Sequence, residues 1–181
     1  MNNTGVAAAG LMHGSEVDQL EATVNVNITA ALRPAHAAVE GFVACRRGTL
    51  INLCSVLALA PERFNAVYSG TKSFMLNLSM ALQTELANTG IRVQAVLPAA
   101  IRTGLWGKAG VDLAAMPAEK VMDADDTVDA ALAGFDIGEV VTIPFLPDMA
   151  EWSRFNVRLA MGPNLSLAQA ARRYHRAGEA A

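Results

Sequence analysis

Cysteine and histidine are scarce in this chain, and their scarcity excludes several kinds of site. The 181 residues include two cysteines and three histidines. Because His13, His36 and His175 lack the spacing of metal ligands, we expect no metal site. Cys45 falls on a predicted helix and Cys54 on a predicted buried strand, and two such thiols favour a reducing compartment. No base is evident near Cys54, so we interpret it as a small buried residue rather than a nucleophile.

Positive charge and long apolar runs are also missing. The formal net charge of −3 gives no reason to expect a nucleic acid or an anionic membrane as a partner. No apolar run reaches the ~18 residues of a spanning helix, and the N-terminus lacks the positive region of a secretory signal. We therefore expect a cytoplasmic chain. With 52% apolar and 17% charged residues, the sequence suits one α/β domain over residues 1–181.

Tyr68 and Lys72 stand four residues apart at the start of a predicted helix that runs to about Asn88. Side chains at this spacing project from one face of a helix. A tyrosine titrates near pH ~10, and a nearby ammonium is expected to lower that pKa and make the phenol a usable acid or base. The pair alone is equally compatible with an ordinary helix that carries one exposed lysine.

Ser55 strengthens the catalytic interpretation. It lies thirteen residues before Tyr68, directly after a predicted buried strand at residues 49–54. Open α/β sheets bind their ligands at the carboxyl ends of such strands. A hydroxyl at that place can hydrogen-bond a substrate oxygen as the oxygen gains charge.

Six separated elements together resemble the short-chain dehydrogenase/reductase family over nearly the whole chain. They are Asn2-Asn3-Thr4-Gly5, Asn27, Ser55, Tyr68, Lys72 and the segment Pro98 to Thr103. The resemblance implies a Rossmann-type three-layer α/β/α fold with a parallel sheet of about three to four strands. It also implies a homodimer or homotetramer.

The resemblance further implies hydride transfer between NAD or NADP and a small carbonyl or secondary alcohol substrate. Tyr68 would be the acid or base, and Lys72 would lower the pKa of Tyr68 and bind the nicotinamide ribose. Ser55 would fix the substrate oxygen, and Asn27 would hold a water that relays protons. The residues implied in cofactor binding are Asn3, Tyr68, Lys72, Ile101 and Thr103.

A glycine-rich dinucleotide turn is absent, since neither G-x-x-x-G-x-G nor G-x-G-x-x-G occurs in the sequence. In the family this turn precedes the Asn-Asn-x-Gly motif, so we expect an N-terminally truncated catalytic portion of the fold. The alternative is a non-catalytic fragment or pseudoenzyme that acts as an interaction module through its long helices.

The remaining pattern places further elements along the chain. A capping signal at Ser15 begins a helical pattern that runs to about residue 46, with a possible break at residues 25–27 and Pro34 in its interior. Residues 105–117 are expected to form a substrate lid, with Trp106 and Met116 as its apolar lining. The other predicted elements are strands at residues 92–97 and 139–143 and helices at residues 127–134 and 152–176.

Overall fold

The computed structural model describes residues 1–7 and 10–156. The chain divides into two compact units, residues 1–145 and residues 146–181. In the second unit, α6 (Met149–Phe155) begins after Asp148, whose carboxylate accepts a hydrogen bond of 2.8 Å from the Ala150 amide. The predicted helix at residues 152–176 therefore has only its first part within the described residues, and a single domain over 1–181 stays a prediction.

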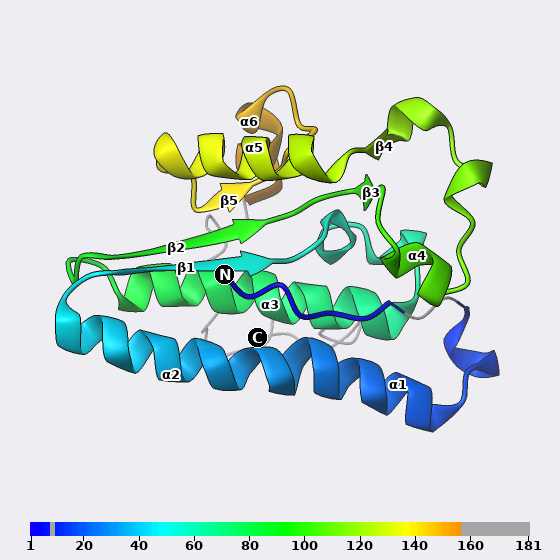
Figure 1. The fold of residues 1–181 in the computed structure, drawn as a ribbon, viewed down its shortest axis with the longest axis horizontal. Helices are drawn as coiled ribbons and strands as arrows, with labels where there is room; N and C mark the ends of the chain where they lie inside the picture. The colour runs from blue at the N-terminus through cyan, green and yellow to red at the C-terminus, as the bar shows by residue number, and fades with distance from the viewer. Residues whose placement is uncertain (8–9, 157–181) are drawn as a thin grey trace, which may run out of the picture. The chain divides into compact units, whose positions relative to one another are not determined.

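The main sheet of the first unit is parallel throughout. Its strands are β1 (Gly48–Leu53), β2 (Ile91–Val96) and β5 (Val141–Thr142), in the order β1-β2-β5. The start of the chain pairs with β1 as well, in a parallel bridge between Asn2 and Asn52. Figure 1 shows this first segment running beside β1. The expected parallel sheet is confirmed.

Helices cover both faces of the sheet (Figure 1). On one face lie α1 (Val17–Val24), α2 (Ala30–Cys45) and α3 (Ala66–Glu85), and on the other lies α5 (Ala124–Asp136). Asn52 of β1 donates a hydrogen bond to Ser79 of α3, whereas Gln94 of β2 donates one to the Ala131 carbonyl of α5. These contacts confirm the three-layer α/β/α arrangement. Within the described ranges, no helix has both the length and the apolar character needed to cross a membrane.

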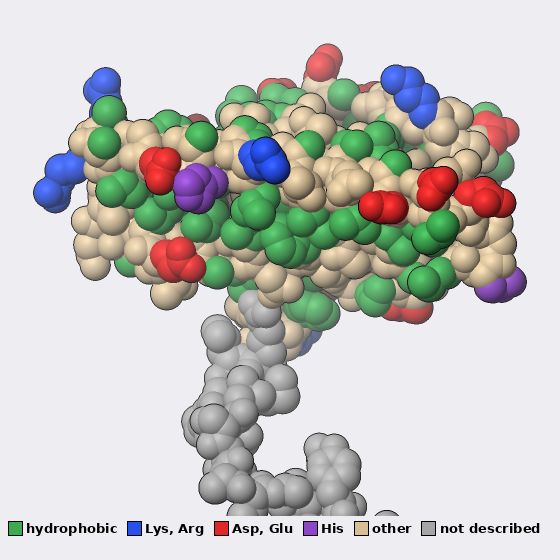
Figure 2. Space-filling view, turned by 90° about the horizontal axis from the view of Figure 1, so that it is seen from below, with side chains coloured by type: hydrophobic (Ala, Val, Ile, Leu, Met, Phe, Trp, Pro, Cys, Tyr) green, Lys and Arg blue, Asp and Glu red, His purple; other side chains and the backbone are tan. Residues whose placement is uncertain are grey.

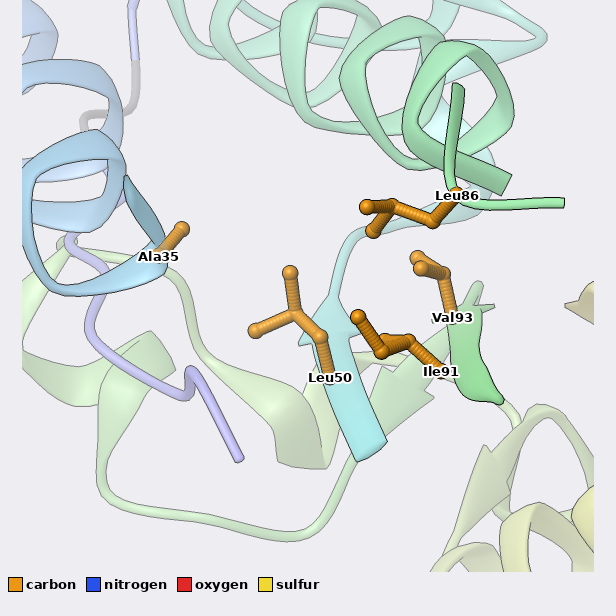
Figure 3. Close-up of a cluster of buried hydrophobic side chains, with 5 residues drawn as sticks. All are labelled: Ala35, Leu50, Leu86, Ile91 and Val93. Atoms are coloured by element: carbon orange, nitrogen blue, oxygen red, sulfur yellow. The ribbon is translucent and has the colours of Figure 1, made fainter. Parts of the chain in front are cut away.

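The hydrophobic core lies between β1, β2 and the helices α2 and α3. One cluster of this core comprises the buried side chains Ala35, Leu50, Leu86, Ile91 and Val93 (Figure 3). Ile91 and Val93 are two residues apart in β2, so their side chains lie on the same face of the sheet. Leu50 of β1 pairs with Val93 and faces the same cluster. Leu86, the C-cap residue of α3, belongs to this cluster, whereas Phe74 in the helix itself is 36% exposed.

The helical pattern before β1 breaks where the sequence predicts. A π-helical turn, Asn25–Thr29, joins α1 to α2, and Asn27 is buried within it. Such turns are often found at functional sites. Pro34 lies inside α2, which continues to Cys45.

The predicted capping signal at Ser15 is wrong. The N-cap of α1 is Glu16, which makes no side-chain capping hydrogen bond. The Ser15 hydroxyl donates instead to the Leu11 carbonyl over 2.8 Å, so it is engaged with the turn that precedes the helix.

A second, two-stranded parallel sheet follows β2. It pairs β3 (Ala100–Ile101) with β4 (Val121–Met122) and so joins the two ends of the intervening segment. That segment contains the predicted lid and begins with the short helix α4 (Leu105–Lys108).

Candidate active site

A cavity of about 550 Å³ lies at the carboxyl ends of β1 and β2. The segments that follow the two strands, Leu53–Ser55 and Pro98–Ala99, form part of its wall. Six of the sequence-predicted site residues line it: Asn3, Ser55, Tyr68, Lys72, Ile101 and Thr103. Asn27 does not line it. The fold therefore brings six predicted residues from four segments of the chain to one cavity.

Ser55 is placed by the parallel pairing that continues beyond β1. The Cys54 amide donates to the Val96 carbonyl over 2.8 Å, which holds the chain in register with β2 one residue before Ser55. Ser55 then has extended backbone angles and caps a short 3₁₀ turn, accepting a hydrogen bond from the Leu57 amide over 3.2 Å. Ser55 is buried, with 6% of its surface exposed. Its hydroxyl also hydrogen-bonds the Tyr68 phenol.

Asn65 sets the start of the helix that carries Tyr68. Its Oδ1 accepts a hydrogen bond of 3.0 Å from the Tyr68 amide, and its Nδ2 donates to the Gly10 carbonyl over 2.8 Å. This residue was not predicted from the sequence. An asparagine just before a helical pattern is a recognised N-cap signal that could have found it.

Tyr68 and Lys72 share one face of α3, as their spacing predicts. Both residues are buried, at 4% and 6% exposure. Lys72 Nζ lies 5.6 Å from the centroid of the Tyr68 ring and donates a hydrogen bond of 3.1 Å to the Leu53 carbonyl. The lysine thus connects the helix to the end of β1 directly beneath the tyrosine ring.

The pKa of Tyr68 differs from the sequence prediction. Burial raises the pKa of Tyr68 to about 12, while its hydrogen bond to Ser55 acts in the opposite direction. Burial also lowers the pKa of Lys72 below its ordinary value. The expected lowering of the Tyr68 pKa is therefore wrong for this structure, because burial is the largest cause of the shift. The physical reason is that removal from water disfavours the phenolate and the ammonium alike.

Asn27 holds the segment that follows the first bridge of the sheet. Its Oδ1 accepts from the Val6 amide over 2.8 Å, and its Nδ2 donates to the Val6 carbonyl over 2.9 Å. Nδ2 also donates to Thr71 Oγ1 over 3.0 Å. A Cβ built on Gly5 would lie 3.4 Å from Lys72 Nζ and 3.5 Å from Asn27 Oδ1. Asn27 and Lys72 therefore border the same small space beside Gly5.

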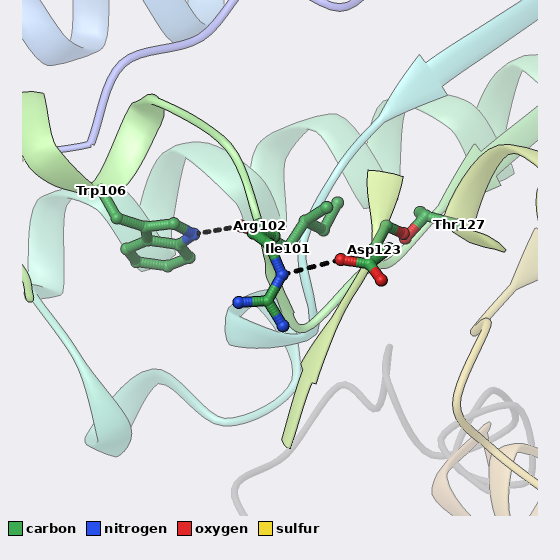
Figure 4. Close-up of polar contacts among 5 residues, drawn as sticks. All are labelled: Ile101, Arg102, Trp106, Asp123 and Thr127. Carbon is green, nitrogen blue, oxygen red and sulfur yellow. Dashed lines mark hydrogen bonds and ion pairs between the residues drawn. The ribbon is translucent and has the colours of Figure 1, made fainter. Parts of the chain in front are cut away.

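The predicted lid contributes Trp106 to the cavity but not Met116. The indole Nε1 donates a hydrogen bond of 3.0 Å to the Ile101 carbonyl (Figure 4). Met116 is half-buried elsewhere in the segment, so its expected role as cavity lining is wrong. The sequence could not distinguish the two, because the turns of the segment decide which side chain faces the cavity.

The base of the lid is joined by polar contacts that the sequence analysis missed. Arg102 Nε lies 2.7 Å from Asp123 Oδ1, and the Arg102 amide donates to the Met122 carbonyl over 2.9 Å (Figure 4). Thr127 in turn donates its hydroxyl to the Asp123 carbonyl over 2.9 Å. Because the ion pair is more than half exposed, its contribution to stability is small, and the β3–β4 pairing is the main connection.

The cavity lining combines apolar and hydroxyl groups with two cations. Lys72 and Lys108 line it, and no acidic side chain does so within the described part of the chain. The same residues include no group of three side chains that could hold a metal ion. Hydroxyl, amide and ammonium donors beside apolar walls suit the polarisation of a substrate oxygen.

Comparison with known proteins gives consistent matches. Residues 1–113 match the family model described as short chain dehydrogenase. A short-chain dehydrogenase from Sphingobium yanoikuyae, solved in complex with NADPH, is 43% identical with a TM-score of 0.91, over 96% of this chain and 68% of that one. The bulky-bulky ketone specific alcohol dehydrogenase from Comamonas testosteroni is 38% identical with a TM-score of 0.85, over 96% and 65% of the two chains.

A curated relative shows how much of such a protein this chain spans. The inactive 2-(S)-hydroxypropyl-CoM dehydrogenase 2 of Xanthobacter autotrophicus is 29% identical over 143 residues, which are 78% of this chain and 58% of the relative. The chain thus spans less than two thirds of that relative's length. The family model covers more than half of the chain, and the three-layer fold agrees with the solved structures. The chain belongs to the short-chain dehydrogenase family.

Proposed function

We propose that this chain is the catalytic portion of an NAD(P)-dependent oxidoreductase that transfers a hydride between the cofactor and a carbonyl or secondary alcohol substrate. The observation that carries the proposal is the convergence of Ser55, Tyr68 and Lys72 on one cavity at the carboxyl ends of two parallel strands. Two relatives support it, one solved with NADPH and one described as specific for bulky ketones.

The nicotinamide end of NAD or NADP fits the donors of the cavity. Asn3, Ile101 and Thr103 line the cavity together with Lys72, which has given only one of its three N–H groups to the Leu53 carbonyl. We assign the remaining ammonium hydrogens to the ribose hydroxyls, and Thr103 and the Ile101 backbone to the carboxamide. The cofactor, when bound, supplies or accepts the hydride.

Tyr68 is the proton donor in the proposed reduction. Burial raises the pKa of Tyr68, so its phenol is protonated at neutral pH and holds a proton that it can deliver to the carbonyl oxygen. Ser55 is hydrogen-bonded to the same phenol, so its hydroxyl is placed to fix the same oxygen. In the oxidation direction, Tyr68 first releases its proton to the relay and, as the phenolate, takes the proton of the alcohol. The two hydroxyls are concentrated where negative charge develops on the substrate oxygen.

The proton that leaves Tyr68 has to be replaced, and we assign this to Lys72 and Asn27. Lys72 Nζ and Asn27 Oδ1 both border the space beside Gly5. Both amide hydrogens of Asn27 are already donated, to Val6 and Thr71, so its Oδ1 is the atom that can hold a water. The relay water of this proposal lies in that space, between Asn27 and Lys72.

Substitution of Tyr68 tests the proposed role. In a version that also carries a glycine-rich cofactor-binding portion, Tyr68→Phe removes the acid and keeps the ring, so turnover of an aryl ketone with NADPH or NADH should fall by about 10²- to 10⁴-fold. Ser55→Ala is the second variant, with Ser73→Ala as its matched control, because the Ser73 hydroxyl bonds the Ala58 and Ser69 carbonyls outside the cavity. Near-normal turnover in Tyr68→Phe with an unchanged circular dichroism spectrum would contradict the assignment.

Assembly forms a second part of the proposal, and here an alternative function is testable. Figure 2 shows hydrophobic side chains gathered in a band along the face that carries α1 and α2. Val17, Leu32 and Val43 are 71%, 40% and 46% exposed on these helices. We propose that this face joins copies of the chain into a homodimer or homotetramer. A pseudoenzyme acting as an interaction module would assemble in the same way but show no turnover with either cofactor, so sedimentation and activity together separate the two functions.

A further inference from the structure

Three aromatic rings from three segments of the chain form one array beside the cavity. Phe64 lies 5.5 Å from Tyr68 and 6.1 Å from Trp106, measured between ring centroids, with interplanar angles of 79° and 85°. Edge-to-face contacts of this kind are favourable because the positive ring edge meets the negative ring face. Phe64 therefore connects the tyrosine of α3 to the tryptophan of the lid.

Trp106 is held at its opposite, polar edge as well. Its Nε1 donates to the Ile101 carbonyl over 3.0 Å, and Figure 4 shows the indole reaching back to the strand β3 that precedes the lid. Trp106 and Tyr68 both line the cavity, whereas Phe64 does not. The indole is thus held by one hydrogen bond and one ring contact, and Trp106 also lines the cavity.

The backbone around Phe64 is fixed by its neighbour. Phe64 has extended backbone angles, with φ −155° and ψ −167°, and directly precedes Asn65, the N-cap of α3. Asn65 hydrogen-bonds both the Tyr68 amide and the Gly10 carbonyl. Because Phe64 directly precedes Asn65, these bonds fix the backbone of Phe64 relative to the helix that carries Tyr68. The spacing between Tyr68 and Trp106 therefore depends on Phe64.

We propose that Phe64 is a positioning residue that sets Trp106 as a flat apolar wall of the cavity, and that this wall selects substrates with an aryl group next to the reacting carbon. The inference rests on the proposed function for the reacting carbon itself. Val6, Ala7 and Leu105 add apolar surface to the same lining. An aryl group gains a ring contact with the indole that a saturated ring of similar volume does not gain.

A binding titration without cofactor tests this inference. The chain has two tryptophans, so Trp152→Phe leaves Trp106 as the single fluorescent reporter. In this parent, 1-phenylethanol should bind ~3- to 10-fold more tightly than 1-cyclohexylethanol, the advantage expected of one aromatic pair. Phe64→Leu should abolish most of that preference and lower the fluorescence anisotropy of Trp106, because the indole loses its ring contact.

Three further variants separate a positioning role from a general loss of structure. Phe64→Tyr keeps the ring and should restore both the preference and the anisotropy. Phe64→Met keeps apolar volume without a ring and should behave like Phe64→Leu. It provides a second ringless variant in case Phe64→Leu fails to fold. Phe74→Leu is the matched control, because Phe74 is an exposed phenylalanine of α3 that does not line the cavity, and it should change neither measurement.

Each contrary result has a distinct meaning. No saturable binding, equal affinity for the two alcohols in the parent, or an unchanged preference in folded Phe64→Leu would overturn the inference. Because no hydride transfer occurs in the titration, a failed turnover assay with intact aryl preference would refute the proposed function instead. Normal turnover without an aryl preference would be consistent with the proposed function and would refute the role of Phe64 and Trp106 in substrate selection.

Discussion

Gly5→Ala tests the proposed proton relay through the space beside residue 5. The added Cβ would lie 3.4 Å from Lys72 Nζ and 3.5 Å from Asn27 Oδ1, which are ordinary van der Waals distances. Gly5 is not among the glycines with positive φ, so alanine is compatible with the backbone. The methyl group would therefore fit, but it would occupy the volume that we assign to the relay water.

The expected effects on stability and on turnover differ in size. A compatible Gly→Ala change gains about 0.4–1 kcal/mol from the unfolded state, and the lost hydration of Lys72 opposes this gain, so the free energy of unfolding should change by less than about 1 kcal/mol. Turnover should fall by about 10- to 100-fold, less than the ~10²- to 10⁴-fold loss of an entire acid. Tyr68 would still deliver its proton, but its reprotonation would slow.

The assay compares two glycine variants. NADPH consumption with an aryl ketone and thermal unfolding are measured for the unsubstituted protein, Gly5→Ala and Gly41→Ala, each in a version that also carries a glycine-rich cofactor-binding portion. A Cβ on Gly41 of α2 would meet no atom within 4 Å, so Gly41→Ala should gain about 0.5–1 kcal/mol of stability and keep full turnover. Unchanged turnover in a folded Gly5→Ala protein would refute the relay position. A loss of stability well above 1 kcal/mol would refute the steric argument.

Three other predictions follow from burial. The pKa of Tyr68 is about 12 in the folded state, against 10.0 in the unfolded chain. Between pH 10 and 12 the folded state therefore keeps the phenol proton that the unfolded chain loses. The free energy of unfolding should fall by about 3 kcal/mol as the pH rises over this range. Tyr68→Phe should show a smaller loss in pH-dependent unfolding, and the part that remains is expected from Cys54, whose pKa burial also raises. Burial raises the pKa of Cys54 to about 12, so a chromogenic disulfide reagent should label only the exposed Cys45 in the folded protein, and Cys45→Ser should abolish the rapid reaction. Gly134→Ala should lower the free energy of unfolding by about 1–3 kcal/mol, because its Cβ would overlap the Thr142 side chain, and urea titration measures this loss.

Local periodicity accounts for the parts of the fold that the sequence predicts well. Three elements are long enough for their residue pattern to repeat several times. They are the strands at 48–53 and 91–96 and the helix at 66–85. The β3–β4 pair has two residues in each strand, too few for any period, and was not predicted. The last strand was placed at 139–143 but pairs only at Val141–Thr142, since partner contacts define where a strand ends.

What the sequence alone determined about the site is the set of residues that share an element. Tyr68 and Lys72 meet because both belong to one helix with a 3.6-residue period, and Ser55 reaches them because parallel strands end at one edge of a sheet. The tertiary structure decided the rest. The direction of the Tyr68 pKa, the partners of Asn27 and the place of Phe64 between two rings depend on which distant segments remove water or approach within a few ångströms, and no local pattern encodes those distances.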